Sequence, residues 1–123
     1  LLDVLGNSGV GTICFSPLAQ GMLTDKYMDG LPKDSRAVKD SPFLNTSQVL
    51  EILPKIKALN EIANDRNQTL AQMAISWILK DDRITSVLIG ASKTEQILDS
   101  VKAIKNTVFS ENEIIAIDTI LKK

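Results

Sequence analysis

Histidine is absent from the 123-residue sequence, and cysteine, tyrosine and tryptophan each occur once. Without histidine, this chain cannot itself provide a histidine general base, a histidine metal ligand or a Ser-His-Asp triad. The single cysteine, Cys14, cannot form an internal disulfide, and its place in an apolar run favours a small buried side chain over a reactive thiol. This cysteine usage fits the reducing conditions of the cytoplasm.

A strong charge of one sign and a long hydrophobic run are also missing. The 14 Lys and Arg residues nearly balance the 15 Asp and Glu residues, which leaves a formal net charge of -1. This balance argues against a general nucleic-acid or anionic-membrane binder, because such proteins carry a clustered basic excess. No apolar run approaches the roughly 18 residues that a membrane span requires. The composition, 44% hydrophobic and 24% charged, is typical of one globular domain.

Residues with helical apolar spacing surround two short apolar runs. Residues 10–15 and 86–90 are rich in β-branched residues and bounded by Gly or Pro, which predicts two buried strands. Because helical segments separate them, the strands are expected to pair in parallel in an α/β sheet. Helices are predicted at residues 1–5, about 49–63, 70–78, 94–104 and 111–121. In the helix at 94–104, the side chains expected to face inward are those of Ile97, Leu98, Val101 and Ile104.

Two predicted helices begin with a capping box. Thr69 stands three residues before Gln72, and Ser110 stands three residues before Glu113. In this motif the hydroxyl accepts from the amide of the third helical residue, whose side chain reaches back to the amide of the cap. Pro54 lies within the first long helical pattern, which leaves the start of that helix open.

Each predicted strand ends in a small polar loop. FSPLAQG ends the first strand, whereas GASKTEQ ends the second and runs directly into a helix. In α/β proteins, ligands bind at the carboxyl ends of the strands, and the free amides of a helix N-terminus favour phosphate. Ser92 and Lys93 add a hydroxyl and a positive charge. Two simpler interpretations stay open: Pro17 only ends the strand, and Ser92 or Thr94 is a plain helix N-cap.

Taken together with three further motifs, these two loops make the sequence resemble the aldo-keto reductase superfamily. SPLAQG, DKY, G-x-P-x-x-S-R, A-Q-x-A-x-x-W-x-L and S-V-L-x-G-A-S-x-x-E-Q occur in this order. The likeness runs from residue 1 to about 120, and it is strongest to the branch with L-glyceraldehyde 3-phosphate reductases and voltage-gated potassium channel β-subunits. It implies an α/β fold, the C-terminal part of a (β/α)8 TIM barrel. Residues 10–15 would be strand seven, residues 86–89 strand eight, and a last helix would follow barrel helix eight.

The resemblance further implies an NADP(H) site formed by both loops. Phe15 matches the aromatic residue that stacks on the nicotinamide, and the segment along the pyrophosphate matches Ser16, Pro17, Leu18, Gln20 and Gly21. The basic loop positions that reach the phosphates match Lys26 and Arg36. The loop that holds the 2′-phosphate and adenine matches Gly90, Ser92, Lys93 and Gln96. Asp99 matches an acidic position near the adenine, whereas Ser100 departs from the family's usual Asn.

The implied activity is reduction of a small carbonyl substrate by hydride from the cofactor, with a Tyr protonating the oxygen. The family's catalytic Asp, Tyr, Lys and His match no residue of this chain, since Tyr27 belongs to the DKY motif. The implied partners are the missing N-terminal half of the barrel and, with two exposed sheet edges, further copies in a homo-oligomer. Two alternatives are an NADP(H)-binding regulatory subunit like the channel β-subunits and an inactive, self-associating fragment.

A complete barrel takes about 250 residues. We therefore expect residues 1–123 to be the C-terminal fragment of one barrel domain, starting near the end of a helix. The long segment at residues 16–46 has few large apolar residues, so we expect its order to depend on cofactor phosphates.

Overall fold

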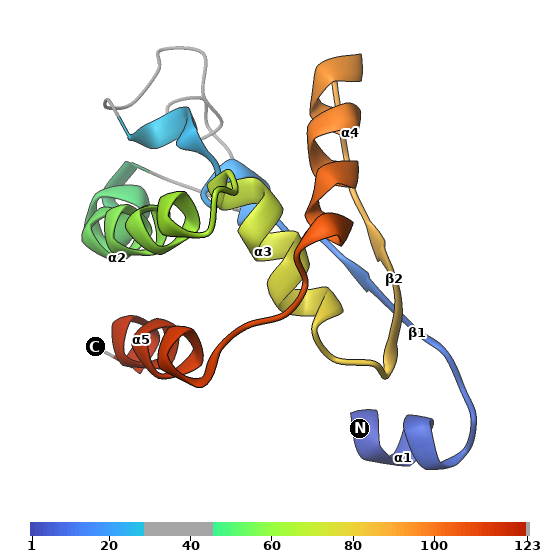
Figure 1. Cartoon of the computed structure of the whole chain (residues 1–123). Coiled ribbons are helices and arrows are strands. Elements are labelled where there is room, and N and C mark those ends of the chain that lie inside the picture. Colours follow the sequence, from blue (N-terminus) through green and yellow to red (C-terminus); the bar gives the residue numbers. More distant parts are fainter. Residues whose placement is uncertain (29–45, 123) are drawn as a thin grey trace.

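A two-stranded parallel sheet organises the part of the chain that this computed structural model describes, residues 1–28 and 46–122 (Figure 1). The strand β1 (Thr12–Phe15) pairs with β2 (Ile84–Leu88), and Phe15 stands opposite Leu88 at the carboxyl end. The predicted parallel pairing is therefore confirmed. The strand β1 begins two residues later than predicted, at residue 12, and β2 begins two residues earlier than predicted, at residue 84.

The remaining elements follow the predicted order. The helix α1 (Leu2–Asn7) precedes β1, and two 3₁₀-helices, η1 (Ala19–Gly21) and η2 (Asp25–Tyr27), follow it. The connection between the strands contains α2 (Thr46–Asp65) and α3 (Leu70–Leu79). After β2, the chain forms α4 (Thr94–Val101), η3 (Lys102–Lys105) and α5 (Glu111–Lys122). The predicted single helix at 94–104 thus ends in a 3₁₀-helix, and α2 runs through Pro54.

A bulge near the start of the sheet explains one glycine. Thr12 pairs with Ile84, but Ile13 pairs with Ser86, so Thr85 is an extra residue in β2. The Thr12 N–H donates to Thr85 Oγ1 at 3.2 Å. A Cβ atom at Gly11 would lie 2.7 Å from that oxygen, so only glycine fits this close approach without a shift.

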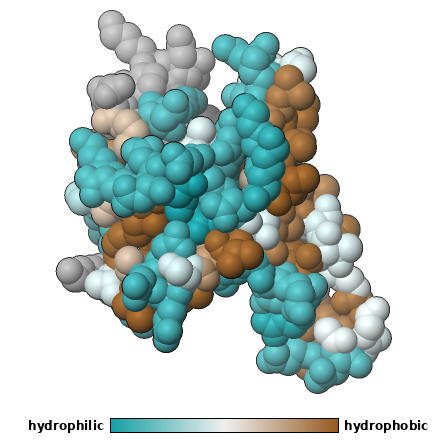
Figure 2. All heavy atoms as spheres, viewed as in Figure 1, coloured by the Kyte–Doolittle hydropathy of each residue, from teal (hydrophilic) through white to brown (hydrophobic). Residues whose placement is uncertain are grey.

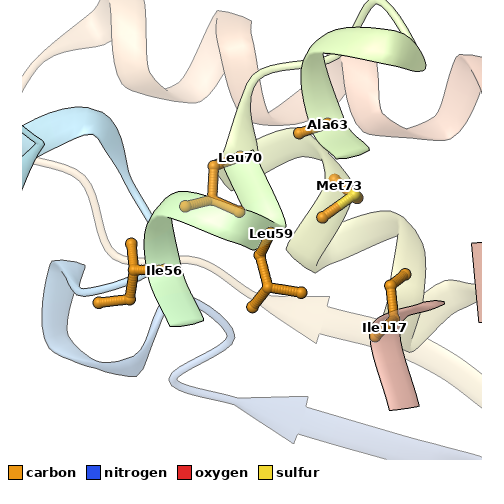
Figure 3. Close-up of a cluster of buried hydrophobic side chains, with 6 residues drawn as sticks. All are labelled: Ile56, Leu59, Ala63, Leu70, Met73 and Ile117. Carbon is orange, nitrogen blue, oxygen red and sulfur yellow. The ribbon is translucent and has the colours of Figure 1, made fainter. Parts of the chain in front are cut away.

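The hydrophobic core lies between α2, α3 and α5. Figure 1 shows α3 between the strands on one side and the pair formed by α2 and α5 on the other. The core cluster combines side chains of all three helices: Ile56, Leu59, Ala63, Leu70, Met73 and Ile117 (Figure 3). The Trp77 and Phe109 rings meet edge to face beside this cluster, with centroids 5.2 Å apart. Because these side chains interdigitate, truncating one such as Leu59 to Ala would cost about 2–5 kcal/mol.

The sheet has one covered face and one open face. The helix α3 packs on β2, and the paired residues Cys14 and Val87 are half-buried. Side chains alternate along a strand, so Ile13, Phe15 and Leu88 point the other way and are 61%, 79% and 58% exposed. In the part of the chain that the structure describes, the two strands predicted to be buried are therefore covered on one face only. Among residues 1–28 and 46–122, no element covers the second face.

The apolar side of α4 is also uncovered. Ile97, Leu98, Val101 and Ile104, which were expected to face inward, are 47%, 61%, 54% and 64% exposed. Figure 2 shows hydrophobic residues gathered on the side of the molecule where α4 lies. The side of α4 and η3 that is buried carries small residues instead, Ser100 and Ala103. The expectation that these four side chains face inward is therefore wrong. As with the open sheet face, the periodicity identifies the apolar side of an element but not what covers that side.

Both capping boxes are confirmed. Thr69 Oγ1 accepts from the Gln72 amide at 3.1 Å, and Gln72 Oε1 accepts from the Thr69 amide at 3.2 Å. At the start of α5, Ser110 Oγ accepts from the Glu113 amide at 3.3 Å, and Glu113 Oε2 accepts from the Ser110 amide at 2.6 Å. Each cap removes unsatisfied amides from a helix start, and losing its hydroxyl would cost about 1 kcal/mol.

Candidate functional site

The two predicted loops meet at the carboxyl edge of the sheet. Because Phe15 pairs with Leu88, residues 16–21 and residues 90–96 leave the sheet at the same edge. The strand pairing therefore brings together the two segments that the sequence singled out. This arrangement, with ligand-binding loops following adjacent parallel strands, is the usual place of a site in α/β proteins.

The first loop has an unusual backbone. Ser16, Ala19 and Gln20 have positive φ angles of 56°, 46° and 59°, and Gly21 has a φ of 93°. Non-glycine residues in this region cost of order 1–3 kcal/mol each, and such strain gathers at functional sites. Hydrogen bonds between nearby backbone groups hold the turn, including one from the Gly21 amide to the Leu18 carbonyl at 2.9 Å. Pro17 lies between Ser16 and Ala19, two of the residues with positive φ.

The side chains of the first loop differ in exposure. Phe15, at the end of β1, is 79% exposed and therefore free to present its ring to a ligand. Ser16 is exposed as well. The other predicted contacts of this loop are half-buried: Pro17, Leu18, Gln20 and Gly21.

The segment after the strained turn is held by packing. Thr24 Oγ1 donates to the Gly21 carbonyl at 2.7 Å and accepts from the Lys26 amide at 3.2 Å. Tyr27 is 1% exposed and packs with Val49 of α2. Its buried hydroxyl has no hydrogen-bond partner among the described residues. Apolar burial therefore orders this part of the loop, which the sequence did not predict. Arg36 lies outside the described residues.

The second loop places two amides around one oxygen. Gln96 Oε1 accepts from the Ser92 amide at 2.8 Å and from the Lys93 amide at 3.1 Å. Neither Ser92 nor Thr94 is the N-cap of α4, because Lys93 occupies that position with an extended backbone. The simpler interpretation of a plain hydroxyl cap is therefore wrong. Gly90, Ser92, Lys93 and Gln96 are all exposed, and Lys93 forms no ion pair with a described residue.

Asp99 is held by the capping box of α3. Its Oδ1 accepts from Gln72 Nε2 at 2.6 Å, and its Oδ2 accepts from Thr69 Oγ1 at 3.1 Å. Lys102 Nζ lies 3.9 Å from Oδ1. The predicted direct contact of Asp99 with an adenine stays a prediction, but this carboxylate already links α4 to α3.

The sequence analysis missed a buried arginine that joins three segments. Arg66 has a side chain that is 3% exposed, and its Nη1 donates to Glu113 Oε1 at 2.7 Å. Its Nε donates to Gln68 Oε1 at 2.9 Å, and Gln68 Nε2 donates to Ser76 Oγ at 2.9 Å. Burial raises the pKa of Glu113, but hydrogen bonds from Ser110 and Arg66 outweigh it and lower that pKa below its usual value. The sequence carries no local signal for this contact, because Arg66 and Glu113 are 47 positions apart.

A second charged cluster lies at the opposite end of the sheet. Arg83 pairs with Asp81 and also with Asp3 of α1. The side-chain and backbone hydrogen bonds from Arg83 lower the pKa of Asp81 to about 2. An open groove of about 700 Å³ lies here, lined by residues 79–83, 107–109 and 114. Since this groove precedes β2, it is separate from the edge where the two loops meet.

Other kinds of site find no support in the described ranges. Among residues 1–28 and 46–122, no three His, Cys, Asp or Glu side chains gather in a group that could hold a metal ion. Within the same ranges, no helix is both long enough and apolar enough to cross a membrane.

Sequence comparison gives matches along nearly the whole chain. The model of the Aldo/keto reductase family matches residues 1–122. "L-glyceraldehyde 3-phosphate reductase" of Escherichia coli (strain K12) is 49% identical over 127 residues, which cover 96% of this chain and 35% of that protein. "Probable voltage-gated potassium channel subunit beta" of Arabidopsis thaliana is 39% identical over 106 residues, covering 84% of this chain and 32% of that protein. The chain thus spans about a third of the length of these relatives.

Structural comparison identifies the fold. The glycerol dehydrogenase AKR11B4 from Gluconobacter oxydans matches 98% of this chain with 37% of its own, at a TM-score of 0.75 and 24% identity. The holo form of the aldo-keto reductase AKR11C1 from Bacillus halodurans matches 97% of this chain with 36% of its own, at a TM-score of 0.66 and 19% identity. Both are TIM barrels, so the predicted fold class, part of such a barrel, is confirmed.

Proposed function

This chain belongs to the aldo/keto reductase family, and from that premise we propose that it forms the cofactor-binding part of an NADP(H)-dependent reductase of small aldehydes and ketones. The observation that carries the proposal is the meeting of the strained loop at 16–21 and the amide-rich turn at 90–96 on one edge of the sheet. Aldo-keto reductases generally use NAD(P)H. Choice of NADP over NAD is part of the proposal.

The residues at this edge suit a phosphorylated, aromatic cofactor. The Ser92 and Lys93 amides both donate to one oxygen, that of Gln96, which holds this exposed turn in a fixed shape. The ammonium group of Lys93 adds charge at the same turn. Phe15 offers an exposed aromatic face next to the first loop. The donor set and the exposed ring together therefore fit a dinucleotide.

Each residue has a proposed role. Phe15 stacks on the nicotinamide, and the first loop lines the pyrophosphate with Ser16, Pro17, Leu18, Gln20 and Gly21. Lys26 and Arg36 neutralise the phosphates. Gly90 allows close approach of the backbone. Around the 2′-phosphate and adenine stand Ser92, Lys93, Gln96 and Asp99.

The bound cofactor supplies the hydride for the carbonyl carbon. The residues of this chain bind and orient it, and we propose that the acid–base groups belong to a part of the protein outside residues 1–123. The described part has one tyrosine, Tyr27, and its burial against α2 makes it unsuited to reach a substrate.

We also propose that the remaining strands of a barrel cover the two open surfaces. The open sheet face and the apolar side of α4 would be hydrated if residues 1–123 stood alone, which is unfavourable for apolar surfaces of this kind. The relatives are about three times as long as the match. A homo-oligomer and a cytoplasmic location complete the proposal, the latter because Cys14 is a free thiol.

A second candidate function is cofactor sensing without rapid turnover. It is favoured by the 39% identity to a protein named as a potassium channel β-subunit. A third candidate is an inactive fragment that associates through its open surfaces.

Two measurements separate these candidates. Titration of the full-length protein with NADPH and NADH, followed by fluorescence, should show tighter binding of NADPH, and steady-state assays with small aldehydes should show NADPH oxidation. Tight binding without turnover would favour the sensor, and no binding would overturn both. Size-exclusion chromatography of residues 1–123 alone tests the fragment.

A further inference from the structure

The helix α4 carries the second loop of the candidate site, so whatever orients α4 also orients that loop. Hydrophobic packing does little of this within the described ranges, because Ile97, Leu98 and Val101 are about half exposed or more. A helix held by few apolar contacts depends on specific polar contacts for its orientation. The polar contacts between α4 and its neighbours therefore decide where the loop stands.

Asp99 makes those contacts. Its two carboxylate oxygens accept separate hydrogen bonds, from Gln72 Nε2 at 2.6 Å and from Thr69 Oγ1 at 3.1 Å. Both donors belong to the capping box of α3, far away in sequence. A carboxylate is suited to this position because it accepts at both oxygens.

The hydrogen bonds within the capping box fix which atoms of Thr69 and Gln72 are left to bind Asp99. Gln72 uses Oε1 to accept from the Thr69 amide, which leaves its Nε2 as the donor to Asp99. Thr69 Oγ1 accepts from the Gln72 amide, which leaves its hydrogen for Asp99. The donors and acceptors of Thr69, Gln72 and Asp99 thus determine one another.

One turn of α4 separates this network from the second loop. Gln96 stands one helical turn before Asp99, so the two side chains lie on the same side of α4. Gln96 accepts from the Ser92 and Lys93 amides, and it thereby shapes the turn that carries the side chains proposed to bind the cofactor's phosphate. Two sets of hydrogen bonds, joined by one turn of α4, therefore connect the start of α3 with the candidate site.

We propose that Thr69 and Gln72 are positioning residues for cofactor binding, and that they act through Asp99 by fixing α4 and the turn at residues 92–96. The proposal rests on the proposed function, because it assigns the turn to the cofactor. Asp99 keeps its proposed place near the adenine, but its contribution to affinity is assigned here to the link with α3 and not to a direct contact with the ligand.

An exchange of donor and acceptor tests the proposal in the full-length protein. Gln72→Glu keeps the cap of α3, since Glu is a usual residue at this position, but it sets two carboxylates against each other. Asp99→Asn leaves one donor without an acceptor. The double variant Gln72→Glu/Asp99→Asn restores both bonds. The introduced amide nitrogen donates to the introduced carboxylate, which reverses the native direction, and the introduced amide oxygen still accepts from Thr69. The double variant also keeps the wild-type charge.

The dissociation constant of NADPH should rise about tenfold in Gln72→Glu, as expected for loss of a charge-assisted hydrogen bond. The double variant should return to within about threefold of the wild type. Asn112→Asp, which adds the same charge at an exposed position of α5, should leave binding unchanged. If Gln72→Glu is too unstable to titrate, Asp99→Asn and the double variant give the same comparison.

Hydrogen–deuterium exchange without cofactor provides a second readout. Amides of residues 92–101 should exchange faster in Gln72→Glu and return to the wild-type rate in the double variant, while α3 stays protected. Unchanged exchange would overturn the proposal, as would altered exchange with unchanged NADPH affinity. Failure of the double variant to regain affinity would assign Asp99 to direct contact instead. A wild-type protein that binds no NADPH would overturn the proposed function, whereas the exchange data would still report on the network.

Discussion

The guanidinium carbon of Arg66 lies 3.7 Å from the centre of the Phe109 ring. The same guanidinium donates to Glu113 at 2.7 Å and to the Asn106 and Val108 carbonyls at 3.1 Å each. One buried side chain therefore connects the end of α2, the segment before α5 and the first turn of α5. Residues distant in sequence depend on it for their relative placement.

Arg66→Lys should destabilise the full-length protein by about 2–3 kcal/mol, because an ammonium group cannot reproduce the planar set of donors. Urea denaturation measures the change. Arg83→Lys is the matched control, since the same substitution at a partly exposed ion pair should cost much less. Equal losses for the two variants would show that the Arg66 network contributes little.

Asp81 should make stability depend on pH. Its pKa of about 2 in the folded state lies below the value of about 3.9 in an unfolded chain, so its contribution is present above pH 4 and is lost as the pH falls toward 2. Asp81→Asn should therefore lower the urea midpoint at pH 6, and the difference from the wild type should shrink between about pH 4 and pH 2. A constant difference across this range would contradict the depressed pKa.

Ala19→Gly tests the strain in the first loop. Ala19 has a φ of 46°, which costs an L-residue roughly 1–2 kcal/mol, while the added freedom of glycine in the unfolded chain costs about 0.5–1 kcal/mol. The variant should be as stable as the wild type or up to about 1.5 kcal/mol more stable. Ala71→Gly, inside α3, should lose about 1 kcal/mol. Similar losses at both positions in thermal unfolding would argue against strain at residue 19.

Lys93→Ala tests the preference for NADP. The 2′-phosphate is the only group that distinguishes NADP from NAD, and a charge-assisted hydrogen bond to it from an exposed lysine should be worth about threefold to tenfold in affinity. Isothermal titration should show this loss for NADP and almost none for NAD. If both cofactors lost affinity equally, Lys93 would not recognise the 2′-phosphate.

Residues 1–123 expressed alone should associate through their open surfaces. Sedimentation velocity should show species that grow with concentration, because Leu88 on the open sheet face is 58% exposed. Leu88→Lys should reduce this association. Leu50→Lys, at a similarly exposed leucine on α2, should have less effect because it lies away from the sheet. A cooperative monomer at every concentration would contradict the prediction.

Much of the fold followed from the sequence because its causes are local. The capping boxes at Thr69 and Ser110 act over three residues, so their motifs predicted both helix starts correctly. Alternation of helices with two apolar runs was enough to predict the parallel pairing, and that pairing brought the two loops to one edge. The roles of the loop residues toward NADP(H) stay predictions, since they depend on a bound cofactor.

Tertiary structure alone decided the features whose partners are far apart in the sequence. Arg66 meets Glu113 across 47 positions, and Gln72 meets Asp99 across 27, so no local pattern marks either pair. The positive φ angles of Ser16 and Ala19 arise where the chain must turn sharply after β1, a demand that residue type does not reveal. Periodicity likewise identified the apolar sides of the strands and of α4, but whether a side is buried depends on what packs against it.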